Sequence, residues 1–416
     1  MARSRLNLTA IELGTSGIKA VMGDLLDDGS LTIVGTADAR ATGKIIKGEI
    51  LNMEAVSDTL GDVITKLEDS TRQRVRAVVM GITGRHIGSV NAHSDVPVSS
   101  SDRIISEEDA AEALGHAEAY SLPHKHRMLH RFQRPYVIDG SRRTRSPVGM
   151  AGSQLTANVH IVFGDDNIIR TSENLIDEYL GHKPVDVAFN GVASMFGLGL
   201  WEGQDNGILV LDIGAGVTDY VVVHQGACHF AGQITIGTEH LVNDLAIGLR
   251  LQPQKCREIV RRDVTAKETT ADAQGIIQIE THIGHPPMIV KRSVITTIAQ
   301  ARLQEMLEVI RDDLEMRDVR SLIGEKIMIC GGGALIPQIT KLAEDVFGTP
   351  CMAGLPVNVA GGGEELDSPR MVTPVGLLHY AIAMDEQRRA TQPSFFEVLG
   401  GESAKIGSLI RKAFRF

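Results

Sequence analysis

Two apolar segments about 200 positions apart share the same order of residues. Residues 6–13 and 207–213 are apolar strands whose ends carry an acid, Glu12 and Asp212. A turn of small residues follows each, and then a second apolar strand, at 18–22 and 220–224. A strand, a tight turn and a strand form the pattern of a β-hairpin. Its repetition predicts a duplicated α/β unit.

The turns of these hairpins carry candidate chemistry. Glycine has no Cβ, so consecutive backbone N–H groups can approach an anion, and a carboxylate at the strand end can hold hydrated Mg²⁺. One such turn alone is more often an ordinary β-turn. Two that face each other would clamp a nucleotide triphosphate from both sides. A third element, the strand 326–330 running into Gly331, Gly332 and Gly333, permits close approach of a flat ring to the backbone, and Pro337 then marks the start of a helix ending near Phe347.

Periodicity places further elements in the first half of the chain. We expect a helix over 53–67 and a strand over 76–82. The pattern of apolar and polar positions then changes over 87–162, which indicates an inserted small α/β domain. Within it, an acidic turn at Ser106 introduces a helix over 102–120. The basic cluster 124–131 could indicate a metal or nucleic-acid site, but it lacks a nearby carboxylate in metal-ligand spacing, which favours a solvated face.

After the insert, the chain returns to the first half with predicted helices over 167–180 and 193–200 and a predicted strand over 185–189. The second half has predicted helices over 239–248, 253–263 and 293–316 and predicted strands over 276–283 and 288–291. Residues 386–402 are rich in glycine and polar residues and predict a linker. In 403–416, helical spacing separates an apolar face from a cationic one. The apolar face includes Ile406, Leu409, Ile410 and Phe414, and the cationic face holds Lys405, Arg411, Lys412 and Arg415. This amphipathic end predicts membrane contact; the alternative is a helix docked on the protein's own body.

Composition narrows the classes of protein. A chain of 416 residues needs at least two domains. No apolar run reaches the ~18 residues of a spanning helix, and the start does not resemble a signal peptide, so we expect a cytoplasmic protein. The four cysteines have no C-x-x-C spacing, which favours reduced thiols over a metal site or disulfides. A net charge of −10 argues against nucleic acid as the main partner, and any membrane contact must be local and basic.

The order of the three glycine motifs resembles the phosphate 1, phosphate 2 and adenosine motifs of the actin, Hsp70 and sugar-kinase superfamily. A narrower resemblance, to the FtsA family of bacterial cell-division proteins, lies in residues 80–87, in 147–155 leading to 160–162, and in the basic amphipathic end. It implies an α/β, actin-like two-lobed fold with duplicated domains, an inserted small α/β subdomain and a C-terminal amphipathic helix. The implied units are 1-86 with 167-203 (1A), 87-166 (1C), 204-236 with 323-385 (2A), 237-322 (2B), the linker 386-402, and the membrane-targeting helix 403-416.

The resemblance also implies a cofactor site for ATP and Mg²⁺. The residues carried over are Gly14, Thr15, Ser16, Gly17, Lys19, Asp212, Gly214, Gly216, Thr218, Gly237, Glu258, Arg261, Gly331, Gly332 and Gly333. Glu12 and Asp212 would hold Mg²⁺ through water. Thr238 departs from the family, which usually has a second glycine there, and Glu12 replaces the usual Asp. Asn190 stands where relatives place a water-orienting Glu or Gln. Since phosphoryl transfer depends on positioning, these changes predict at most a slow ATPase.

The same resemblance implies partners and a location. Arg302 would contact the acidic C-terminal peptide of the tubulin-like division protein FtsZ. The protein would polymerise with itself and bind membrane lipid through 403–416, at the cytoplasmic face of the cell membrane at the division site, with later divisome proteins as further partners. Two rival functions stay open: a sugar or acetate kinase of the same superfamily, and an Hsp70-like chaperone. The kinase has no need of a basic amphipathic end, and the chaperone needs a substrate domain that the short tail cannot supply.

Overall fold

A six-stranded sheet forms the centre of the first half. The computed structural model describes residues 6–26, 30–201, 207–225, 227–269, 275–280 and 287–388. The strand order is β11-β6-β1-β2-β3-β19. Its strands are β1 (Leu6–Leu13), β2 (Gly17–Leu25), β3 (Leu31–Arg40), β6 (Ala77–Ile82), β11 (Asp186–Phe189) and β19 (Val359–Gly361), and a two-stranded ribbon, β4 (Ile45–Ile46) and β5 (Glu49–Ile50), lies beside them.

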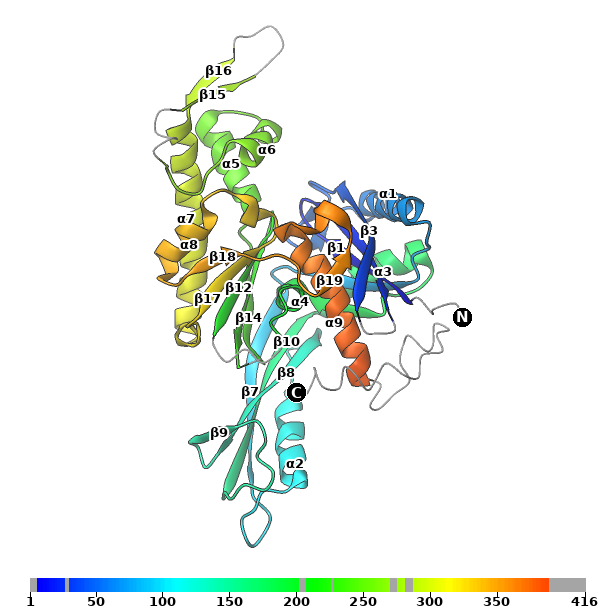
Figure 1. Cartoon of the computed structure of the whole chain (residues 1–416), viewed down its shortest axis with the longest axis vertical. Coiled ribbons are helices and arrows are strands. Elements are labelled where there is room, and N and C mark those ends of the chain that lie inside the picture. The colour runs from blue at the N-terminus through cyan, green and yellow to red at the C-terminus, as the bar shows by residue number, and fades with distance from the viewer. Residues whose placement is uncertain are drawn as a thin grey trace.

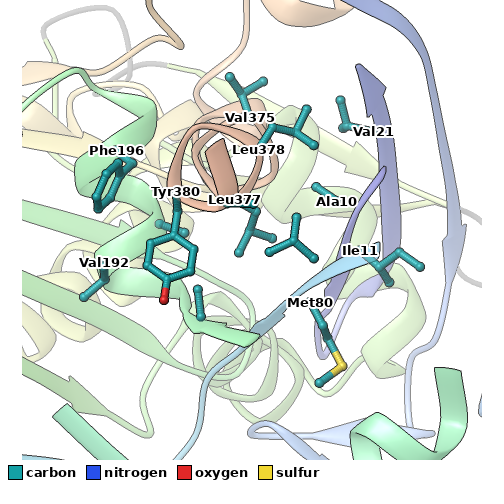
Figure 2. Packing of buried hydrophobic residues seen from close by; sticks show 14 of the residues in the cluster. Ala10, Ile11, Val21, Met80, Val192, Phe196, Val375, Leu377, Leu378 and Tyr380 are labelled. Carbon is teal, nitrogen blue, oxygen red and sulfur yellow. The ribbon is translucent and has the colours of Figure 1, made fainter. Parts of the chain in front are cut away.

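Helices cover both faces of this sheet, which is why every residue of β6 is buried. Helices α1 (Met53–Thr71) and α3 (Asp166–Leu180) pack together on the outer face, and α4 (Asn190–Gly197) and α9 (Val372–Arg388) on the inner one (Figure 1). In Figure 2, Val375, Leu377 and Leu378 of α9 lie between α4 and the strands of the sheet.

The second half repeats this plan. Its five-stranded sheet has the order β14-β13-β12-β17-β18. The strands are β12 (Ile208–Ile213), β13 (Thr218–His224), β14 (Ala227–Ile234), β17 (Lys326–Cys330) and β18 (Cys351–Ala353). In both sheets an antiparallel hairpin is joined by a parallel strand on its far side: β1 pairs with β2 and β6, and β12 with β13 and β17. The predicted duplication is therefore present in the sheet topology.

Two smaller units project from these sheets (Figure 1). The insert holds a four-stranded sheet, β7-β10-β8-β9, and one helix; these are β7 (Ile87–Pro97), β8 (His126–Ile138), β9 (Arg142–Thr144), β10 (Gln154–Asp165) and α2 (Glu107–Glu118). The other unit consists of α5 (Thr238–Leu249), α6 (Pro253–Arg262), α7 (Arg292–Met316), β15 (Ile276–Ile279) and β16 (Met288–Lys291). Helix α8 (Ile339–Phe347) and short 3-10 turns at 320–322, 332–335, 363–366 and 369–371 complete the described chain.

The observed bounds differ from the predicted ones where local caps decide them. Helix α2 begins at Glu107, later than predicted, because Ser106 and Asp109 form a reciprocal capping box. Helix α4 begins at Asn190 instead of Ala193. Helix α8 begins at Ile339 instead of Pro337, since a 3-10 turn precedes it and Gln338 has a positive φ of 66°. Helix α9 continues to Arg388, three residues into the predicted linker range; the range 389–402 and the helix 403–416 lie outside the described residues.

One segment joins a different sheet from the one with which the sequence grouped it. Residues 323–385 were expected to complete the second half, yet β19 pairs in parallel with β3 of the first sheet. Helix α9 likewise packs on β1, β2 and β6. Helix α9 returns to the first half because the inner face of its sheet is apolar and needs a cover, whereas β19 extends the edge of that sheet beside β3.

The cysteines and the composition of the helices complete the description of the fold. Cys228, Cys256 and Cys330 are buried, Cys351 is half-buried, and none of the four forms a disulfide. In the part of the chain that the structure describes, no helix has both the length and the apolar composition that crossing a membrane requires.

Contact between the backbones of α4 and α9 should set the stability of the fold. A Cβ on Gly376 of α9 would lie 1.8 Å from the carbonyl oxygen of Ala193. We expect Gly376→Ala to lower the free energy of unfolding by about 1–3 kcal/mol or more, although alanine is the better helix former. Gly115→Ala in α2 is the matched control, because a Cβ there meets nothing within 4 Å, and it should leave stability unchanged or raised. Thermal midpoints check both; an unchanged midpoint for Gly376→Ala would contradict the packing argument.

Candidate functional site

A cleft of about 570 Å³ lies between the two halves. The turn after β1 and the turn after β12 form two of its walls. The start of α5, one side of α6, residues 331–332 and 335–337, and the start of α9 form further parts of the wall, together with residues of β2 and β3, Thr83 and Asn190. The predicted residues Glu12, Gly14, Thr15, Ser16, Gly17, Lys19, Asn190, Asp212, Gly214, Gly216, Arg261, Gly331 and Gly332 all line it.

The two turns have the same backbone geometry and touch each other. The N–H of Gly14 donates to the carbonyl of Gly17 at 3.0 Å, and the N–H of Gly214 donates to that of Val217 at 3.0 Å. A Cβ on Gly216 would lie 2.4 Å from the hydroxyl of Thr15, so the turns meet across the cleft and only glycine fits there. A ligand with several anionic groups can therefore contact both turns at once.

Strand register places a charged pair beneath each turn. Glu12 lies opposite Lys19 in the β1–β2 pair, and Asp212 lies opposite Asp219 in the β12–β13 pair. Lys19 Nζ contacts Glu12 Oε2 at 2.7 Å and the carbonyl of Arg370 at 3.3 Å. The duplicated hairpins thus differ in charge: the first carries a balanced ion pair, and the second carries two carboxylates.

Buried hydroxyl groups hold the two carboxylates of the second hairpin. Asp212 Oδ2 accepts hydrogen bonds from Thr373 at 2.6 Å and Ser194 at 3.1 Å. Burial and the nearby Glu12 raise the pKa of Asp212. Burial, and then the charge of Asp212, raise the pKa of Asp219 well above its usual value, although Thr83 donates to it at 2.6 Å. A divalent cation in the cleft would favour the ionised form of both.

The described residues contain no group of three His, Cys, Asp or Glu side chains that could hold a metal ion. Mg²⁺, however, usually keeps several waters and takes only one or two carboxylates together with phosphate oxygens. Asp212 and Glu12, which both line the cleft, fit a cation bound in that way.

Glycine and aliphatic residues line the cleft after β17. Gly331 has a φ of 78°, which turns the chain out of β17. Gly331 and Gly332 line the cleft with Leu335 and Ile336, whereas Gly333 is buried. Exposed backbone beside aliphatic side chains suits a planar ring.

Three predicted residues lie elsewhere. Thr218 points away from the cleft, and its hydroxyl donates to the carbonyl of Ile236 at 2.8 Å. Gly237 supports the second turn from behind, as the N-cap of α5. Glu258 faces Lys255 at 3.2 Å, outside the cleft, while its neighbour Arg257 lines it.

Sequence reasoning missed several lining residues. Arg257 makes a two-bonded ion pair with Glu239 of α5, and both side chains line the cleft. Asp219 could have been found, because it follows Asp212 at the spacing by which Lys19 follows Glu12. Arg370 and Thr373 carry no sequence signal, since they reach the cleft only through the return of α9 to the first half.

Asn190 and Arg302 occupy very different environments. Asn190 is the first residue of α4, and its buried side-chain oxygen has no hydrogen-bond partner in the described chain. Arg302 lies on α7, outside the cleft, and contacts Asp244 of α5 and Glu305. The predicted membrane residues of 403–416 lie outside the described residues.

Comparisons with known proteins agree on one family. A model of "Cell division protein FtsA" matches residues 209–376, and a model of the "SHS2 domain inserted in FTSA" matches residues 84–163. The cell division protein FtsA of Pseudomonas aeruginosa is 28% identical over 90% of this chain and 89% of its own length. That of Escherichia coli K12 is 25% identical over 99% of this chain and 97% of its own length.

Solved structures show the same fold at lower identity. The chain superimposes on a chain of the PilM-PilN type IV pilus biogenesis complex with a TM-score of 0.62 and 18% identity, covering 94% of this chain and 100% of that one. For MreB 5 of Spiroplasma citri bound to AMPPNP, the TM-score is 0.55 at 14% identity, covering 94% and 99%. The inserted domain, the duplicated sheets and the relatives matched over almost their whole length lead to one conclusion: this chain belongs to the FtsA family of cell-division proteins, with an actin-like fold.

Proposed function

We propose that this chain binds ATP with Mg²⁺ in the cleft, polymerises at the cytoplasmic face of the cell membrane, and tethers FtsZ filaments to that membrane at the division site. The observation that carries the nucleotide part is the meeting of two like glycine turns above Glu12 and Asp212. Mg²⁺ would lie between these carboxylates and the phosphates and would neutralise phosphate charge. That MreB 5 was solved with AMPPNP and with ADP in the same fold supports the choice of ligand.

Hydrolysis should be slow or negligible. Glu12 is held by Lys19 at 2.7 Å, and Asn190 offers an amide that cannot accept a proton from water at neutral pH. Positioning and charge stabilisation dominate phosphoryl transfer, so binding can persist while the rate is lost. Turnover above about one per second, ordinary for kinases, would favour the sugar or acetate kinase instead.

The FtsZ contact rests on Arg302, and membrane attachment rests on the residues 403–416. One tail has four large apolar side chains, and full burial of each would contribute about 1.5–3 kcal/mol of binding free energy. This gain must offset the free-energy cost of ordering a short helix. A single tail therefore holds weakly. In a filament each subunit adds another tail at high effective concentration, so attachment should follow polymerisation, and polymerisation should follow ATP binding.

The first prediction concerns the cation. Asp212→Asn keeps the side-chain shape and removes its charge, so the affinity for ATP in Mg²⁺ should fall at least tenfold, while the affinity in EDTA changes little. Because the pKa of Asp212 is raised, the Mg²⁺-dependent affinity of the unmodified chain should also weaken as the pH falls toward that pKa. Calorimetric titration measures both. Asp318→Asn, at an exposed position with a φ of 55° that asparagine also adopts, is the control. Equal affinities for Asp212→Asn and the control would contradict the assignment.

The second prediction concerns FtsZ. Arg302→Gln should weaken binding of the FtsZ C-terminal peptide at least tenfold, because glutamine cannot form a charge-assisted fork with a carboxylate. Glutamine is preferable to glutamate, which would place a third carboxylate beside Asp244 and Glu305 and loosen α5 from α7. Fluorescence anisotropy with a labelled peptide measures the affinity, and an unchanged value would remove Arg302 from the interface.

The third prediction concerns the tail. Truncation after Glu402 should release the protein from anionic lipid vesicles, and Phe414→Glu should release most of it, because each removes apolar burial. Ser394→Glu adds the same charge within the predicted linker and should have little effect. Raising the salt concentration should weaken binding only in part, since apolar contacts are not screened. Vesicle co-sedimentation with ATP is the assay; sedimentation of the truncated chain with vesicles would refute the anchor.

A further inference from the structure

The guanidinium of Arg302 is already engaged within the protein. Its Nε and one terminal nitrogen donate to the two carboxylate oxygens of Asp244 at 2.5 and 3.0 Å, and the other terminal nitrogen donates to Glu305 at 2.6 Å. Asp244 belongs to α5, so this pair joins two helices. A two-bonded fork of this kind is the arrangement by which arginine recognises a carboxylate of a ligand.

The group of three is negative as a whole. One cation faces two carboxylates, and the side chains are only partly covered: Arg302 is 25% exposed, Asp244 27% and Glu305 57%. An approaching acidic segment therefore meets net negative charge. A carboxylate of that segment also meets an Arg302 whose Nε and one terminal nitrogen are already hydrogen-bonded to Asp244.

Apolar surface lies beside this group. Ile247, one turn after Asp244 on α5, is 78% exposed. Ile298, one turn before Arg302 on α7, is half-buried against α5, where a Cβ on Gly248 would lie 2.9 Å from it. A partner that is both apolar and acidic matches these two kinds of surface.

We propose that Asp244 occupies, in the free protein, the place that a carboxylate of the partner takes in the complex, so that the acidic FtsZ peptide binds by displacing it. This inference rests on the FtsZ contact proposed above for Arg302. Binding is then an exchange of one arginine–carboxylate pair for another, so the peptide gains less from this contact than it would from an unpaired arginine. Without Arg302, Asp244 and the peptide's carboxylate would face each other with no cation between them, which is why Arg302→Gln should weaken binding. Selectivity would come from the peptide's apolar side chains, which Asp244 cannot imitate.

The exchange has two measurable consequences. Without the competing carboxylate the fork is free, so Asp244→Asn should bind the peptide at least fivefold more tightly. Its binding should also depend more steeply on salt, because a new ion pair forms instead of replacing an old one. If Asp244 instead only holds Arg302 in a productive position, the same substitution should weaken binding.

The test uses the full chain and the labelled FtsZ peptide at low and high salt. Asp244→Asn, Arg302→Gln and the double variant are compared with Asp312→Asn, which removes a carboxylate paired with Arg311 at 2.8 Å on the same helix. Tighter and more salt-sensitive binding by Asp244→Asn, lost in the double variant, is the expected result. Asp312→Asn should leave affinity within twofold of the unmodified chain.

The outcomes separate the two proposals. If Arg302→Gln binds as the unmodified chain does, the FtsZ contact itself is misplaced. If Arg302→Gln weakens binding but Asp244→Asn does not tighten it, the displacement inference is overturned and the FtsZ contact stands. If Asp244→Asn lowers the thermal midpoint by several degrees, Glu305→Gln replaces it in the test, because Glu305 is the more exposed carboxylate of the group. Glu305→Gln should also bind the peptide more tightly than the unmodified chain.

Discussion

The close approach of α4 and α9 is the constraint on which the rest of the structure depends. The carbonyl of Ala193 lies against Gly376, and a Cβ on Gly197 would lie 2.0 Å from the carbonyl of Val372. This contact carries α9 onto the inner face of the first sheet, where one apolar core includes residues of both β1 and β12. The two halves share this core, so the spacing of the cleft above it is set by helix packing.

The chemistry of the cleft follows from this shared framework. Each hairpin places an acid opposite a residue near the start of its second strand, and the two turns meet across the cleft. The charge is asymmetric: Glu12 forms an ion pair with Lys19, while Asp212 and Asp219 accept hydrogen bonds from neutral hydroxyl groups, those of Thr373, Ser194 and Thr83. Burial disfavours the ionised form of these two carboxylates. A cation bound in the cleft would favour that form and would itself be attracted by it.

The features that could be predicted from the sequence are those encoded by a few consecutive residues. The features that depend on packing between distant segments could not be predicted. The turns at Gly14 and Gly214, and the strand 326–330, were predictable because each is a short, self-contained pattern. The actin-like fold with its insert followed from the resemblance that these motifs carry, and the comparisons confirm it. Thr373, Arg370 and β19 were missed because they reach the first half through long-range packing, for which the sequence carries no local signal. Glu258 came from the resemblance and lies outside the cleft, while its neighbour Arg257 lines it, because adjacent helix positions point in different directions and small rotations of α6 decide which one faces the cleft.

The late position of β19 and α9 in the chain has a consequence for synthesis. The first five strands of the first sheet are complete once residue 189 has been made, and α4 follows at once. The edge at β3, and the part of the inner face that α9 covers, gain their partners only after residues 359–388 emerge. During that interval the growing chain would carry a partly uncovered apolar sheet with an open edge, which invites pairing with other chains. Translation rate and chaperone access, rather than the stability of the finished protein, would then limit the yield of correctly folded chains.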